Sequence, residues 1–169
     1  MPDSDAVDLS FLLNQAAYAL EARLGSALAG VGISVRDYCV LMKAAEVERT
    51  QNEVAELAGL DKTTMVVTLD RLERAGLVQR RVSDLDRRAR IVTVTRAGLA
   101  TYERARRIVD AANHEVLTSL SPADRTSLVR GLDQLTAGEG LLASPSHVAP
   151  QRRKEVRTKS VRTRSVSTG

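Results

Sequence analysis

The strongest chemical signal in the chain is a group of arginines near its middle. Eight arginines lie from Arg71 to Arg96 against three acidic residues, a local excess of +5. Three of them, Arg87, Arg88 and Arg90, fall within four consecutive positions. A guanidinium binds phosphate oxygens bidentately, and it also enters narrow minor grooves, where the potential of DNA is most negative. Several of these arginines, taken singly, are equally well explained as solvated surface charges, but the group predicts contact with duplex DNA.

A β-hairpin is expected to present these arginines. Leu77–Val82 and Arg90–Thr95 are short and rich in β-branched residues, and Ser83-Asp84-Leu85-Asp86 between them has the composition of a turn. Asp86 is well placed to orient Arg88. The predicted structure is a wing that carries its positive charge at the tip.

Two short helical patterns that meet at a glycine precede this hairpin. Thr50-Gln51-Asn52-Glu53 is a capping box, which predicts a helix from Gln51. Gly59 provides a positive-φ turn, Asp61 caps a second helix, and Gly76 ends it. The expected apolar contacts of this helix-turn-helix are Val54, Leu57, Leu60 and Met65, with Ala55 allowing close approach.

The second helix is the predicted recognition helix. Met65, Leu69 and Leu72 give it one apolar face. Side chains near the N-terminus of a helix reach base edges when the helix docks in a major groove. The residues of this helix predicted to contact DNA are Lys62, Thr63, Thr64, Val67, Thr68 and Arg71.

Amphipathic helices are predicted on both sides of this region. The first runs from Asp8 to Leu28, and a second begins after a capping box at Ser34 and continues to about Glu46. Thr95 caps a long helix to about Leu120, and Ser121-Pro122 starts the last one. These helices carry more apolar surface than one small domain needs to cover, which predicts a symmetric homodimer.

The segments Asp70–Val78 and Asp86–Gly98 resemble two motifs of the MarR (multiple-antibiotic-resistance regulator) family. The first looks like the family's "DRLE-x-x-G-L-V", and the second like its wing, "DRR" followed by an apolar strand and "T-x-x-G". The resemblance covers roughly residues 8 to 138. It implies that Asp86 anchors the wing, Arg88 enters the minor groove, and Thr63 and Thr64 face the major groove.

Two positions depart from the family's pattern. Val67 stands where many members have a basic or polar residue, and Asp84 stands where a proline is common. The first departure bears on which bases are contacted and leaves the mode of binding unchanged.

The predicted fold is mainly α with a small β-hairpin wing, a winged helix-turn-helix flanked by dimerisation helices. A MarR-like domain is expected over residues 1–142, with the DNA-reading part at about 34–97 and the dimerisation helices at about 8–30 and 96–138. Hydrophobic residues make up 43% of the chain and aromatic residues 2%, so the core is expected to be aliphatic.

A basic, disordered tail is predicted for residues 143–169. It holds seven basic residues against Glu155 alone, or +6, so the rest of the chain, with 18 basic and 20 acidic residues, carries −2. The high isoelectric point is therefore no evidence that the folded domain binds DNA. The tail is either a mobile arm that touches phosphates or a solubilising extension.

The resemblance implies a ligand-responsive repressor that binds a pseudo-palindromic operator as a homodimer. Its effector, a small molecule, would occupy a cleft beside the first two helices. The distinctive residues there are Tyr18, Arg23, Tyr38 and Cys39. Two alternatives stay open: a winged-helix module that binds an acidic protein partner, and a redox-responsive regulator that uses Cys39.

Enzymatic chemistry has little support in the sequence. The two histidines, His114 and His147, are not spaced with Cys39 as metal ligands, and no glycine-rich phosphate loop is present. We expect no catalytic residue, metal or cofactor. No apolar stretch is long enough to cross a membrane, and the single cysteine suits a reducing compartment, so a cytoplasmic location is expected.

Overall fold

The structure is a computed structural model that describes residues 8–84 and 86–137. It is mainly helical with one small sheet, which confirms the predicted fold class. The predicted tail lies outside the described residues. The elements in chain order are α1 (Leu9–Leu28), the 3-10 turn η1 (Ala29–Val31), α2 (Val35–Glu46), β1 (Arg49–Thr50), α3 (Gln51–Leu57), α4 (Lys62–Arg74), β2 (Val78–Val82), β3 (Arg90–Val94), α5 (Arg96–Thr118) and α6 (Pro122–Ala137).

The helices of the DNA-reading part begin where side chains cap them. Ser34 and Thr50 each form a capping box, with Asp37 and Glu53 as the respective partners. The Asp61 carboxylate accepts hydrogen bonds from the backbone N–H groups at positions 63 and 64, at 2.9 and 3.0 Å. All three predicted starts are confirmed, because each depends on contacts within three residues.

Glycines end two of these helices in the left-handed region. Gly59 has φ 64° between α3 and α4, and Gly76 has φ 69° between α4 and β2. A residue with a Cβ is disfavoured at such φ values. The helix-turn-helix and its exit into the wing therefore have the geometry that the sequence predicts.

The sheet has three strands in the order β1-β3-β2, and both pairings are antiparallel. The hairpin pairs Val78 with Val94 and Val82 with Arg90. The sequence predicted only these two strands. The additional strand, β1, is two residues long and pairs Arg49 with Val92, too short to produce a period-2 pattern.

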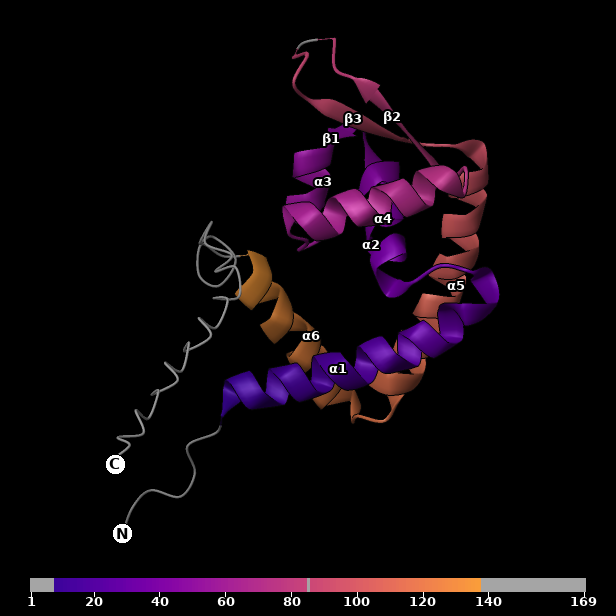
Figure 1. The fold of residues 1–169 in the computed structure, drawn as a ribbon. Coiled ribbons are helices and arrows are strands. Elements are labelled where there is room, and N and C mark those ends of the chain that lie inside the picture. The colour runs from indigo at the N-terminus through magenta and orange to yellow at the C-terminus, as the bar shows by residue number, and fades with distance from the viewer. Residues whose placement is uncertain (1–7, 85, 138–169) are drawn as a thin grey trace, which may run out of the picture.

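The core is aliphatic and joins both halves of the described chain. Its fully buried side chains are Leu28, Val40, Leu41, Val54, Met65, Leu69, Leu72, Val78 and Val92. α5 packs against α1 and α2, so it connects the DNA-reading part to the first helix. The wing and α1 lie at opposite ends of the molecule (Figure 1).

The predicted burial of Leu57 is wrong. Its side chain is 50% exposed, whereas Val54 and Ala55 are buried and Ala58 is half-buried. Leu57 therefore lies about 100° around the helix from the centre of the buried face. Of the remaining predicted contacts, Leu60 is partly buried and packs on the core.

The terminal helices expose apolar side chains. On α1 these are Leu9, Phe11, Leu12, Leu13 and Tyr18, and on α6 they are Leu128, Val129, Leu132 and Leu135.

Within the described ranges no single helix is both long enough and apolar enough to span a membrane. The bent helix pair Leu9–Val31 and Val35–Glu46, at 77°, meets the test by length and composition alone.

The start of α5 is seated against the end of α4 through Gly98. A Cβ at this position would lie 2.0 Å from the carbonyl oxygen of Leu77 and 2.7 Å from Cγ1 of Val94. Thr95, which caps α5, also donates its hydroxyl to the carbonyl of Gly76 at 2.8 Å. No side chain fits between these elements at Gly98.

We expect Gly98→Ala to lower the free energy of unfolding by about 3 kcal/mol, because the added methyl overlaps backbone that is held on both sides. Urea denaturation at one fixed protein concentration measures this. Gly25→Ala is the matched control, since no heavy atom lies within 4 Å of the place that a Cβ would occupy there in α1. The control should gain up to about 1 kcal/mol from helix propensity. Equal urea midpoints for the two variants would contradict the close packing.

Candidate nucleic-acid interface

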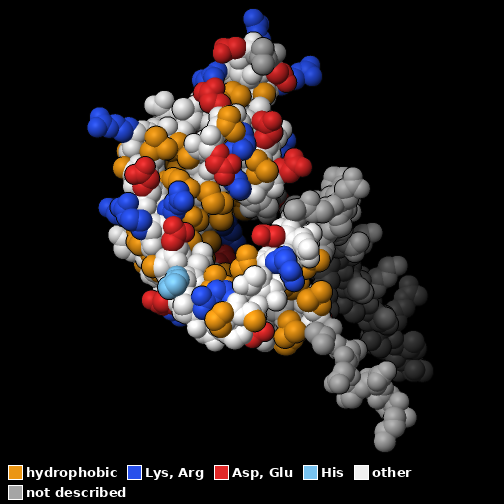
Figure 2. Space-filling model, turned by 180° about the vertical axis from the view of Figure 1, so that it is seen from behind, with side chains coloured by type: hydrophobic (Ala, Val, Ile, Leu, Met, Phe, Trp, Pro, Cys, Tyr) orange, Lys and Arg blue, Asp and Glu red, His pale blue; other side chains and the backbone are white. Residues whose placement is uncertain are grey.

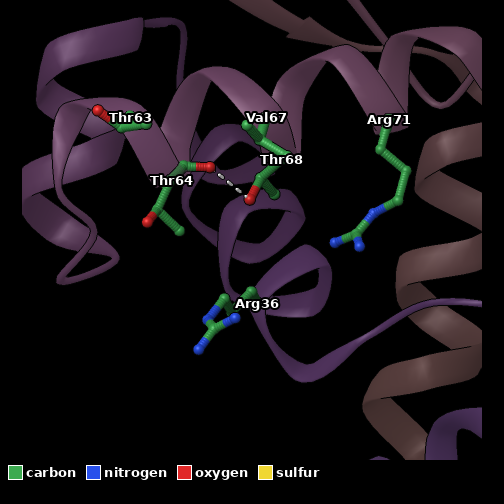
Figure 3. Close-up of a pocket in the computed structure, with 6 residues that line it drawn as sticks. All are labelled: Arg36, Thr63, Thr64, Val67, Thr68 and Arg71. Atoms are coloured by element: carbon green, nitrogen blue, oxygen red, sulfur yellow. Dashed lines mark hydrogen bonds between the residues drawn. The ribbon is translucent and has the colours of Figure 1, made fainter.

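The outward ridge of α4 is formed by residues of the predicted recognition face. Lys62, Thr63 and Val67 are exposed, the last at 61%. In Figure 3, Thr63 and Val67 lie along the upper edge of the helix, while Thr64, Thr68 and Arg71 point toward Arg36 of α2. The six predicted residues thus divide between the ridge and the side of α4 that faces α2.

The hydroxyl groups on the α2 side are engaged within the helix. Thr64 is half-buried and donates its hydroxyl to the Asp61 carboxylate at 2.6 Å. Thr68 donates to the backbone carbonyl of Thr64 at 2.8 Å. Both hydroxyls therefore make local hydrogen bonds. The bonds that the Asp61 carboxylate accepts, from the Thr64 side chain above all, hold its pKa below the usual value.

The placement of Thr68 on the exposed face is a correction. Its side chain is 3% exposed. The residue lies where α4 packs against α2. Its hydroxyl donates a hydrogen bond to the Thr64 carbonyl in the preceding turn, so the buried hydroxyl has a partner. Helical periodicity put position 68 near the boundary of the apolar face, and only the packing decides on which side it falls.

Arg71 ties α4 to the N-terminus of α2. Its guanidinium donates to Oδ1 of Asp37 from Nη2 at 2.6 Å and from Nε at 3.2 Å, and to the Ser34 hydroxyl at 3.0 Å. Asp37 is 3% exposed. A charge-assisted pair with a buried carboxylate fixes the angle between the two helices. The sequence predicted here only the capping box at Ser34, so this second role of the Asp37 carboxylate is a finding of the structure.

A cavity of about 250 Å³ lies between α4 and the first turn of α2 (Figure 3). Five of its lining residues come from the predicted recognition helix: Thr63, Thr64, Val67, Thr68 and Arg71. The sixth is Arg36 of α2, which the sequence did not predict as a site residue.

The arginines at the base of the wing are paired with carboxylates. Arg80 contacts Glu73 at 2.5 Å and Asp70 at 2.7 Å, both on α4, and Glu73 also accepts the backbone N–H of Arg80 at 3.0 Å. Arg81 contacts Glu48 at 3.0 Å and Asp84 at 3.1 Å. Arg80 thus holds the hairpin against the recognition helix, and Arg81 holds it to the segment that precedes β1.

The arginines at the wing tip form no ion pair with any described residue. Arg87, Arg88 and Arg90 are all exposed, and the bond from Arg90 to the Arg87 carbonyl, at 3.4 Å, is long. Basic side chains project from the wing end of the molecule in Figure 2. Unlike the guanidinium groups at the base, those at the tip are available to a partner.

Asp86 contributes to the turn through the backbone. Its carboxylate accepts the N–H of Arg88 at 2.8 Å, and its carbonyl accepts the N–H of Ala89 at 2.9 Å. The sequence predicts that Asp86 orients Arg88. The contact that exists fixes the backbone from which the Arg88 side chain projects.

The four residues predicted for an effector pocket do not together line either the cavity beside α4 or a second cavity on α1. Tyr18 is 78% exposed and lines a shallow cavity of about 420 Å³ on α1. Arg23 forms an ion pair with Glu115 of α5, and Tyr38 is buried and stacks on Tyr102 with ring centroids 5.8 Å apart. Neither this cavity nor the one beside α4 is lined by Arg23, Tyr38 or Cys39.

Cys39 lies half-buried on α2. Burial raises the pKa of its thiol by more than the nearby Lys43 ammonium lowers it, and the Glu21 carboxylate raises it further. The thiolate is the reactive form of cysteine, so this environment disfavours the redox alternative.

Comparison with known proteins agrees with this arrangement. Residues 31–89, which run from the end of η1 through α2, α3, α4 and β2 to the turn before β3, match the model of the MarR family. This DNA-reading segment is that of the MarR family. The matched residues contain the ridge of α4 and two of the wing-tip arginines, Arg87 and Arg88, which supports a MarR-type regulator.

Relatives of known name cover most of the chain. The HTH-type transcriptional repressor Rv2887 of Mycobacterium tuberculosis is 29% identical over 133 residues, 78% of this chain and 96% of the relative. A MarR-family regulator from Rhodococcus sp. RHA1 is 29% identical with a TM-score of 0.72, covering 78% of this chain and 96% of that one. The repressor CouR, from Rhodococcus jostii RHA1, solved with a 23-mer DNA duplex, is 28% identical with a TM-score of 0.68 over 77% of this chain and 92% of CouR.

The pairing of Glu73 with Arg80 predicts a pH-dependent contribution to stability. Hydrogen bonds from Arg80 hold the pKa of Glu73 below its ordinary value of 4.5. The contribution is therefore complete above that ordinary value and is lost as the pH falls through the lower, folded-state pKa. Glu73→Gln should lower the free energy of unfolding at pH 7, and the difference from the unmodified chain should shrink below about pH 4.

Urea denaturation at about pH 7, 5 and 3.5 measures this difference across the predicted window. Glu103→Gln is the control, because Glu103 is exposed on α5 and forms no ion pair within the described ranges. If Glu73→Gln lowers the free energy of unfolding by the same amount at all three pH values, the stabilising contact between Arg80 and Glu73 does not depend on the charge of Glu73.

Proposed function

We propose that the chain is a ligand-responsive transcriptional repressor that binds a pseudo-palindromic operator as a homodimer. In this proposal the ridge of α4 enters the major groove of each half-site, and the wing reaches the flanking minor groove. Dimer symmetry then predicts half-sites about 10 base pairs apart, one helical turn of DNA.

The observation that carries the proposal is the division of the wing arginines. Arg80 and Arg81 are held by carboxylates, whereas Arg87, Arg88 and Arg90 project from the end of the hairpin without such partners among the described residues. A guanidinium that is not neutralised within the protein gains most from the negative potential of a minor groove. The CouR structure with a DNA duplex supports duplex DNA as the partner.

Two further features support the dimer and the effector. The apolar side chains exposed on α1 and α6 need a partner surface, and a second copy of the chain supplies one. Rv2887 has been solved with salicylic acid, and CouR with p-coumaroyl-CoA. We infer that a small aromatic acid or its thioester releases this chain from DNA by favouring a dimer with wrongly spaced recognition helices.

Titration of the full chain against the DNA upstream of its own gene, with scrambled DNA as competitor, tests the proposal. Nanomolar binding that resists the competitor is expected, as is typical of specific operators. Equal, weak binding to both DNAs that disappears when residues 143–169 are deleted would overturn it. The protein-interaction alternative predicts no preference between the two DNAs.

Arg88→Ala should weaken operator binding by at least about 30-fold without changing the unfolding midpoint, since the substitution removes an arginine contact worth about 1–3 kcal/mol from each half-site and the side chain is exposed. Fluorescence anisotropy at several salt concentrations measures both affinity and salt slope. Arg104→Ala is the matched control, because Arg104 is exposed on α5 and away from the wing. An Arg88→Ala affinity equal to that of the control would remove the wing from the interface.

A further inference from the structure

The centre of the outward ridge of α4 is apolar. Positions 63, 67 and 74 lie within about 40° of one another on a helix of 3.6 residues per turn, directly opposite the buried face. Val67 is 61% exposed, and the neighbouring Val66 is 36% exposed. An exposed isopropyl group thus lies at the centre of the ridge of the helix that would enter the groove.

The surrounding side chains offer little hydrogen bonding to a base at this point. The hydroxyls of Thr64 and Thr68 already donate within the protein. Arg71 is bound to Asp37, and Arg74 donates to the carbonyl of Asp70 at 3.0 Å. The surface immediately around Val67 therefore presents methyl groups, and the polar side chains of the ridge, Thr63 and Arg74, lie one turn before it and two turns after it.

Base chemistry determines what such a surface recognises. Guanine is read by arginine or lysine, and adenine by asparagine or glutamine, through bidentate hydrogen bonds. From Lys62 to Leu69, Lys62 is the one side chain of these kinds. Thymine differs from the other bases by a C5-methyl group in the major groove, which is recognised by apolar contact.

We infer that Val67 determines sequence specificity by packing against the C5-methyl group of one thymine in each half-site. This inference rests on the proposed function, because it requires that α4 lie in a major groove. Val67 contributes no hydrogen bond. Its contact buries methyl groups of both partners and places a thymine where a cytosine, which lacks the methyl, is disfavoured.

Replacement of thymine by deoxyuridine tests the contact, since it removes the methyl and keeps every base-pairing group. An operator is first selected from random duplex DNA with the full chain, and each thymine is then replaced in turn, symmetrically in both half-sites. Burying one methyl is worth about 0.8 kcal/mol, so a replacement in one half-site should weaken binding about fourfold, and the symmetric replacement in both half-sites about 15-fold.

The Val67→Ala variant identifies the residue responsible. The substitution is on an exposed helix position and retains the fold. In this variant the deoxyuridine effect at the identified thymine should fall to less than about twofold, while the effect of changing other bases is retained. Val47→Ala is the matched control: Val47 is 56% exposed and follows α2, away from the ridge, so the full deoxyuridine effect should persist.

The outcomes separate the inference from the function on which it rests. A selected operator in which no deoxyuridine weakens binding, or a deoxyuridine effect unchanged by Val67→Ala, overturns the role of Val67 and leaves the operator-binding function standing. Selection that enriches no sequence overturns the proposed function and this inference together.

Discussion

The contact between Gly98 and the Leu77 carbonyl sets the relation between the DNA-reading elements and the rest of the chain. At this point the start of α5 meets the link between α4 and β2 and the end of β3, with no space for a side chain. Because α5 also packs against α1, a change in the tilt of α5 would act through this contact on the segment that joins the recognition helix to the wing. Such close packing leaves little room for these elements to move relative to one another.

Ion pairs fix α4 from two directions around that seat. Arg71 holds it to the first turn of α2, and Arg80 holds the wing to its C-terminal half. Arginines close in sequence thus have different physical roles. Those that meet carboxylates position the elements, and those at the wing tip carry unneutralised charge to the surface.

The recognition helix combines a rigid mounting with a sparsely polar ridge. Its cap and two of its threonine hydroxyls are satisfied internally, so Val67 is left as the prominent group at its centre. In the proposed complex, the wing would supply much of the electrostatic attraction, and shape and methyl contacts would contribute the discrimination between bases. Affinity and specificity would then be carried by different elements of the same small domain.

The sequence by itself determined the helices, the glycine turns, the hairpin and the arginine-rich tip, because these depend on caps, φ preferences and periodicity within a few residues. It did not determine which arginines are neutralised. Arg71 and Asp37 are 34 residues apart, and only packing brings them together. Neighbouring elements likewise decided that Thr68 is buried and Leu57 exposed, because both lie near the edge of a helix face that the local pattern cannot assign. They also decided the pairing of β1, which is too short to show a strand pattern.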